Sequence, residues 1–74
     1  MKIKIGRREE DSKMVAVGDV VGFKDDIEQS GQIIEIKEGQ SGYRLVLENE
    51  WGFEGEFLEG ETVVTVYAHD CWSL

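Results

Sequence analysis

The chain has 74 residues, of which 41% are hydrophobic, and its 16 acidic residues outnumber 8 basic ones to give a formal net charge of −8. This length fits one domain near the lower limit at which a hydrophobic core alone sustains a fold, so residues 1–74 are expected to form a single domain. The hydrophobic fraction argues against wholesale disorder, and the acidic balance argues against nucleic-acid binding because it repels phosphate.

The single cysteine, Cys71, excludes an intramolecular disulfide framework and indicates a reducing compartment. No stretch is apolar enough to span a membrane, and the first residues lack the apolar run of a signal peptide. We therefore expect a cytoplasmic protein without membrane contact.

The first third of the chain predicts short strands separated by polar segments. Residues 2–5 alternate lysine and isoleucine, a period of two that predicts a strand buried on one side. Residues 6–13 are polar apart from one glycine and predict a loop. Residues 14–23 are rich in valine and contain Gly18 and Gly22, and glycines inside a strand mark bulges or bends.

The middle and last thirds continue this pattern. Residues 24–30 predict a polar turn, after which Gly31 opens a strand that runs to about Glu38, and residues 39–42 (Gly-Gln-Ser-Gly) predict a hairpin connection. Residues 43–48 alternate cleanly, and residues 62–67 predict the last strong strand. No segment has apolar residues at helical spacing, which predicts an all-β barrel or sandwich. The expected core comprises Val21, Phe23, Ile34, Ile36, Leu45, Leu47, Val64 and Val66.

Residues 15–37 resemble an SH3-like barrel of the KOW type, which implies a small five-stranded β-barrel. That family has glycine-aspartate followed by spaced apolar residues, then a turn, then a glycine that opens the second strand. Members occur in ribosomal and transcription-associated proteins, and similar barrels occur in small bacterial and phage proteins. The nucleic-acid-binding members carry basic loops where this chain has Asp25, Asp26 and Glu28. The residues that carry the resemblance are Gly18, Asp19, Val21, Phe23, Gly31, Ile33 and Ile36.

The segment 48–61 is the most unusual part of the chain, with six glutamates, no cation and four large apolar residues. Aromatic side chains anchor protein interfaces and charged rims steer a partner, so this composition is typical of an acidic protein-docking surface. The strand pattern favours a core position for Phe57. For Trp51 and Phe53, the alternative to docking is that one of them caps the open end of the barrel. The candidate partner-binding residues are Trp51, Phe53, Glu50, Glu54 and Glu56.

The tripeptide His69-Asp70-Cys71 contains a possible nucleophile, base and carboxylate. Adjacent residues of an extended chain point to opposite faces, so these three are not expected to converge as a catalytic triad. The chain also lacks the further cysteine or histidine pair that would complete a zinc site, and it has no phosphate-cradling loop. We therefore expect no catalytic site, metal or cofactor.

The leading hypothesis is a non-enzymatic protein-interaction module, of phage or other mobile-element origin, whose acidic surface docks a basic protein partner. One alternative is a KOW-type domain associated with nucleic acid in translation or transcription. Another is an acidic decoy that occupies the nucleic-acid groove of a second protein. The nucleic-acid alternative predicts a single basic patch made of Lys2, Lys4, Arg7, Arg8 and Arg44.

Overall fold

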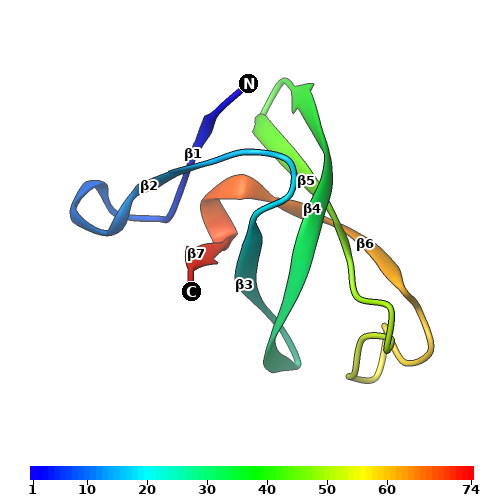
Figure 1. Cartoon of the computed structure of the whole chain (residues 1–74). Coiled ribbons are helices and arrows are strands. Elements are labelled where there is room, and N and C mark those ends of the chain that lie inside the picture. Colours follow the sequence, from blue (N-terminus) through cyan, green and yellow to red (C-terminus); the bar gives the residue numbers. More distant parts are fainter.

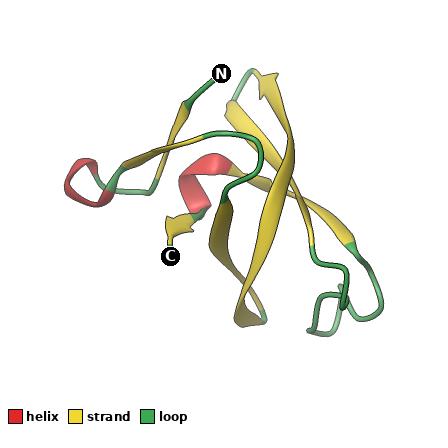
Figure 2. Cartoon of the chain, viewed as in Figure 1, coloured by secondary structure: helices red, strands yellow, loops and turns green.

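A computed structural model describes residues 1–74 and contains only strands, loops and two short 3-10 helices (Figures 1 and 2). No helix is long and apolar enough to cross a membrane. The strands form two antiparallel sheets, one of two strands (β1-β2) and one of five in the order β6-β5-β4-β3-β7. The elements are β1 (Ile3–Ile5), η1 (Glu9–Asp11), β2 (Lys13–Val15), β3 (Val20–Asp25), β4 (Ile27–Gly39), β5 (Gly42–Glu48), β6 (Val63–Tyr67), η2 (Ala68–Asp70) and β7 (Trp72–Ser73).

The N-terminal hairpin confirms the strand predicted at residues 2–5 and buries one face of it. Ile3 pairs with Val15 across the hairpin, and the side chains of Ile3, Ile5 and Val15 are all buried. The valine-rich stretch 14–23 is split into β2 and β3 by a turn at Gly18. The φ of Gly18 is 101°, a value that glycine adopts at little energetic cost. This split and the short C-terminal strand β7 bring the total to seven strands, two more than expected.

The turn between β3 and β4 is shorter than the sequence suggested. The predicted polar turn over residues 24–30 is wrong, because β3 continues to Asp25 and β4 already begins at Ile27. Asp26 makes the turn with a φ of 68°, a left-handed conformation that aspartate tolerates better than most residues. Gly31 therefore does not open the strand. It lies inside β4, opposite Val21.

A β-bulge in β4 decides which isoleucine enters the core. Ile33 pairs with Leu47 but the next pair is Glu35 with Val46, so Ile34 has no partner on β5. The expected core position of Ile34 is wrong: its side chain is 41% exposed, whereas Ile33 is fully buried. Since the extra residue resets the alternation, Ile36 again packs against the core as predicted.

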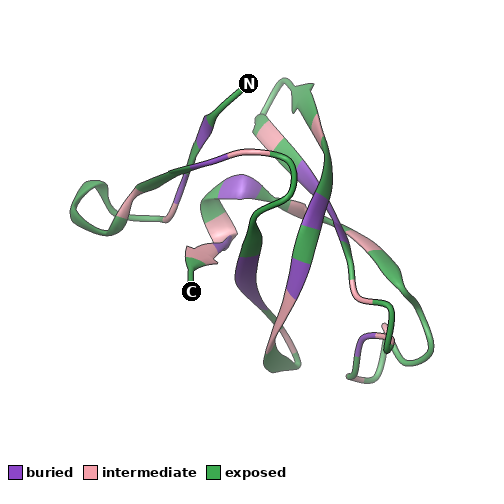
Figure 3. Cartoon of the chain, in the orientation of Figure 1, coloured by how far each residue is buried: buried purple, intermediate pink, exposed green.

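The remaining strands follow the predicted alternation. Gly39 pairs with Gly42, so only Gln40 and Ser41 lie between β4 and β5. In β5, Leu45 and Leu47 are buried, and Val64 and Val66 of β6 are partly buried against the core. The core lies between the curved larger sheet and the N-terminal hairpin (Figure 3). Its buried residues are Ile3, Ile5, Val15, Val21, Phe23, Ile33, Leu45, Leu47, Phe53, Ala68 and Cys71.

The structure confirms the all-β class. Both sheets are open: β6 and β7 form the two edges of the larger sheet, and each pairs with one neighbour only. The short helical turn η2 carries the chain from one edge to the other (Figure 1).

Candidate functional site

The loop between β5 and β6 is held in place by backbone hydrogen bonds at its base. The amide of Asn49 donates to the carbonyl of Thr62 at 2.9 Å, and the amide of Phe53 donates to the carbonyl of Glu61 at 2.7 Å. The side-chain oxygen of Asn49 also accepts a hydrogen bond from the amide of Trp51 at 3.0 Å, which is an Asx turn. This long connection (49–62) is therefore a folded element with a defined shape.

A glutamine of β4 fastens the same loop to the β3–β4 hairpin. The Gln29 side chain accepts a hydrogen bond from the Glu54 amide at 2.9 Å and donates one to the Glu54 carbonyl at 3.0 Å. One side-chain amide thus satisfies both backbone groups of one loop residue, as a neighbouring strand would. Next to it, the Glu56 amide donates to the Asp26 carboxylate at 3.3 Å.

The two aromatic residues proposed to bind a partner have opposite environments. Trp51 is 89% exposed, whereas Phe53 is 2% exposed and packs edge-on against Phe23 with ring centroids 5.5 Å apart. Phe53 is therefore a core residue, and its nomination as a surface anchor is wrong. In an extended chain residues 51 and 53 would share a face, but Gly52 has a φ of 88° and redirects the backbone between them.

Phe57 also differs from expectation. The strand pattern favoured a core position, but no strand forms between β5 and β6, and the Phe57 side chain is 80% exposed. Its neighbour Leu58 is the residue that packs against the core.

Trp51 stands between two hollows in the surface that share Ser30, Asn49, Glu50 and Trp51 in their walls. The larger has a volume of about 670 Å³, and the smaller, of about 440 Å³, extends toward Val20 and Glu48. Neither hollow has a lysine, arginine or histidine in its lining. We call this surface the Trp51 groove. The larger hollow is lined by Glu28, Gln29, Ser30, Asn49, Glu50, Trp51, Gly52, Phe53, Glu54, Glu59, Gly60 and Thr62.

Four of the five predicted partner-binding residues therefore line the Trp51 groove. Glu50, Trp51 and Glu54 line it from the loop, and the buried Phe53 forms part of its floor. Glu56 lies outside its lining, although it belongs to the same loop. The sequence did not single out Glu28, which reaches the groove from β4. The tertiary fold places β4 beside the loop 49–62, and no local pattern in residues 27–30 predicts this contact.

Three of the five cations in the predicted basic patch are each paired with a carboxylate. Lys4 pairs with Glu9 at 2.8 Å, Arg7 with Asp70 at 2.7 Å, and Arg8 with Glu10 at 3.7 Å. The hydrogen bond and charge of Lys4 lower the pKa of the Glu9 carboxyl. Arg44 lies elsewhere, with its guanidinium 5.3 Å from the Tyr67 ring centroid.

A separate hollow, of about 830 Å³, gathers four cations away from the Trp51 groove. It opens between the N-terminal hairpin and the C-terminal residues, and two of its cations, Lys13 and Lys24, were not part of the predicted patch. Its three carboxylates neutralise much of this charge. The charged residues in its lining are Arg7, Arg8, Glu10, Asp11, Lys13, Lys24 and Asp70, and His69 also lies there.

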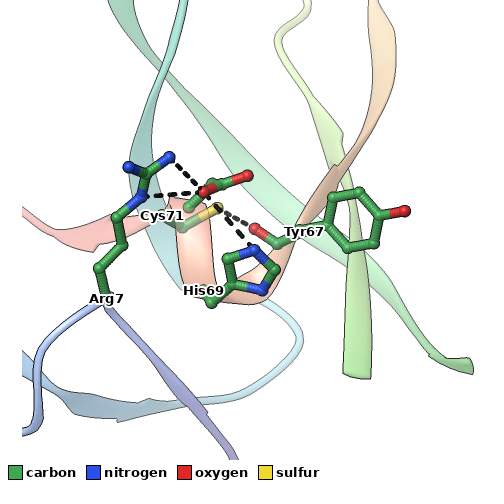
Figure 4. A network of polar contacts seen from close by, with 5 residues as sticks. Arg7, Tyr67, His69 and Cys71 are labelled. Carbon is green, nitrogen blue, oxygen red and sulfur yellow. Dashed lines mark hydrogen bonds and ion pairs between the residues drawn. The ribbon is translucent and has the colours of Figure 1, made fainter. Parts of the chain in front are cut away.

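The tripeptide 69–71 does not assemble a triad (Figure 4). The Asp70 carboxylate lies between Arg7 and His69, with its Oδ1 atom 3.7 Å from His69 Nε2. The Cys71 thiol bonds to neither His69 nor Asp70 and instead donates to the Tyr67 carbonyl oxygen at 3.5 Å. Burial, together with the nearby Asp70 charge, raises the pKa of the Cys71 thiol to about 12, which disfavours the nucleophilic thiolate. No group of three or more His, Cys, Asp or Glu side chains is arranged to hold a metal ion.

Comparisons with protein-family models, with curated proteins and with solved structures give no match for this chain.

Proposed function

We propose that this protein is a non-enzymatic protein-interaction module with an SH3-like fold, and that its Trp51 groove docks a basic segment of a protein partner. The observation that carries the proposal is the 89% exposure of Trp51 in a groove lined by glutamates and by no cation. Leaving an indole in water forgoes the free energy of its burial, and exposed aromatic residues become interface anchors when a partner covers them.

The chemistry of the groove favours a partner segment that carries lysine or arginine. Glu28, Glu50, Glu54 and Glu59 surround the indole in the larger hollow. A cation placed over the indole face gains about 0.5–2 kcal/mol, and the carboxylates steer it there from a distance. Because the loop is already fastened through Asn49 and Gln29, binding would order little additional backbone, which favours affinity.

The SH3-like part of the proposal is supported by the connection between the two edges of the larger sheet. In a flat sheet with strands about 4.8 Å apart, β6 and β7 would lie about 19 Å from each other. The chain from Tyr67 to Trp72 includes the three residues of η2 and spans only about 13 Å at the usual rises of 3-10 and extended backbone. So short a connection requires the larger sheet to curve, which supports the proposed SH3-like shape.

The binding proposal is tested with a lysine- and arginine-rich peptide and an acidic peptide of the same length, titrated into the protein by calorimetry at low and high salt. We expect the basic peptide alone to bind, and Trp51→Ala to weaken binding at least tenfold. Phe57→Ala is the matched control, since it removes an equally exposed aromatic residue that lies outside the groove. Equal affinities of wild type and Trp51→Ala would refute the proposal.

The hollow that gathers Arg7, Arg8, Lys13 and Lys24 is the observation that favours the nucleic-acid alternative. Phosphate binding there would weaken steeply as salt rises, because bound cations are released from the nucleic acid. A Lys13→Gln, Lys24→Gln variant would then lose most of its affinity for single-stranded RNA or duplex DNA. Absence of binding by the wild type at low salt removes this alternative. The decoy alternative instead predicts that the protein competes with nucleic acid for a basic partner.

A further inference from the structure

The outer edge of β6 has backbone groups without partners. In antiparallel pairing, residues alternate between pairs that exchange hydrogen bonds and pairs that do not. The bond from the Asn49 amide to the Thr62 carbonyl identifies that pair as hydrogen-bonded, so Val64 and Val66 also bond to β5. It follows that Val63, Thr65 and Tyr67 direct their backbone groups away from the sheet.

Only one of these groups has another partner. The Tyr67 carbonyl is occupied, because it begins the 3-10 helix η2 and also accepts from the Cys71 thiol at 3.5 Å. The amides of Val63, Thr65 and Tyr67 and the carbonyls of Val63 and Thr65 remain free to pair. In Figure 1, β6 accordingly forms the outer strand of the sheet, with β5 as its single neighbour.

The edge also lacks the usual protection against pairing. Edge strands are normally guarded by charged residues, proline or bulges. In this chain 32% of residues are charged, yet the stretch from Thr62 to Ala68 contains no charge and no proline. The pairing of β6 with β5 shows no bulge. The strand is β-branched or aromatic throughout, and its residues Val63, Thr65 and Tyr67 are all exposed.

The side chains along this edge are self-complementary under a two-fold axis. One end of the strand is acidic, with Glu48 opposite Val63. The other end is cationic, because Arg44 lies over the Tyr67 ring. An antiparallel copy centred on Thr65 brings the acidic end of each edge to the cationic end of the other, and it places each Val63 across from a Tyr67. Aromatic and β-branched residues are a favourable cross-strand pair.

We propose that β6 pairs with β6 of a second copy of this chain, antiparallel and in the register that places Thr65 opposite Thr65. The result is a symmetric dimer with one continuous ten-stranded sheet, five strands from each copy. The pairing uses up the β6 edge on both copies, and the other edge, β7, has only two residues, so assembly stops at the dimer. The net charge of −8 on each copy opposes association, so dimerisation strengthens as salt screens this repulsion.

Sedimentation equilibrium measures the association constant of the wild type and of Thr65→Lys. The substitution places two lysines directly across from each other, and we expect at least a tenfold loss of dimerisation. Gln40→Lys is the matched control: it makes the same charge change at an exposed residue of the β4–β5 turn, and dimerisation should persist. A wild type that stays monomeric at millimolar concentration and high salt would overturn the proposal, as would assembly beyond the dimer.

Disulfide trapping tests the register independently of affinity. Residues opposite each other in a hydrogen-bonded antiparallel pair have Cα atoms about 5.5 Å apart, within the range that a disulfide spans. Thr65→Cys should therefore form a covalent dimer under mild oxidation. Val63→Cys should not, because its own symmetry mate lies four residues away along the strands. The native Cys71 is buried and should contribute no background. Cross-linking of Val63→Cys but not of Thr65→Cys would refute this register.

Discussion

At Gly31 a single added carbon would meet buried atoms of two other segments of the chain. A Cβ on Gly31 would lie 2.9 Å from Leu47 Cβ and 3.2 Å from Phe53 Cζ, both on fully or almost fully buried side chains. Leu47 Cβ is fixed to the backbone of β5 and has no freedom to move aside. Gly31 has no positive φ, so the close approach of these side chains is the reason that glycine is required there.

We expect Gly31→Val to destabilise the domain by about 3 kcal/mol, the upper end of the usual range for overpacking, because valine adds two methyl groups beyond the Cβ. Gly31→Ala adds the Cβ alone and should cost about 1–2 kcal/mol. Gly39→Ala is the control: its Cβ would meet nothing closer than the Gly42 carbonyl oxygen at 3.4 Å, and the backbone there needs no positive φ. Its effect should stay within about 1 kcal/mol, with a gain expected.

Urea unfolding followed by circular dichroism measures these differences. With a slope of about 1 kcal/mol per molar for a domain of this size, the midpoint of Gly31→Val should fall by about 3 M relative to wild type. The midpoint of Gly39→Ala should lie within about 1 M of wild type. Equal midpoints for Gly31→Val and Gly39→Ala would show that β4 does not pass this close to β5 and Phe53, and the packing described above would be wrong.

Three further predictions follow from the same packing. Ile33→Ala should cost about 2–5 kcal/mol in the free energy of unfolding and Ile34→Ala less than about 1 kcal/mol, and equal urea midpoints would contradict the bulge. Gly22→Ala should displace the Trp72 indole, which lies directly over Gly22, and an unchanged tryptophan emission maximum would contradict this contact. The Cys71 thiol should resist alkylation at pH 8 until the protein unfolds. The pKa of the thiol is about 12 in the folded protein and 9.0 ordinarily, so the protonated thiol stabilises the fold fully below pH 9. This stabilisation is lost as the pH rises from 9 toward 12. Over that interval Cys71→Ala should therefore lose less stability than wild type.

Much of the secondary structure could be predicted from the sequence because period-two alternation reports directly on burial of one strand face. Residues 3–5, 43–48 and 63–67 form strands as predicted, and Leu45 and Leu47 are buried. The all-β class followed from the absence of helical spacing. Whether Ile33 or Ile34 is buried could not be predicted from the sequence. The β-bulge depends on how β4 pairs with β5, and the local alternation of residues does not reveal it.

The candidate site was likewise predictable from the sequence in part only. The composition of residues 48–61 pointed to Trp51, Glu50 and Glu54, because aromatic residues among carboxylates without a cation are unusual in any local context. Local sequence treats Trp51 and Phe53 alike, and the tertiary structure separates them. The left-handed backbone at Gly52 turns the Trp51 ring toward water, and the Phe53 ring packs beside Phe23.

Residue types and their alternation thus determined by themselves the all-β class, three of the strands and the acidic character of the segment before β6. Tertiary structure alone decided that Ile33 and not Ile34, and Phe53 and not Trp51, is buried. It also decided that Glu28 lines the Trp51 groove and that β6 has a free edge. The physical reason is that burial and edge exposure depend on which segments, distant in the chain, come to lie beside a residue. A local pattern records only the direction of each side chain relative to its own strand.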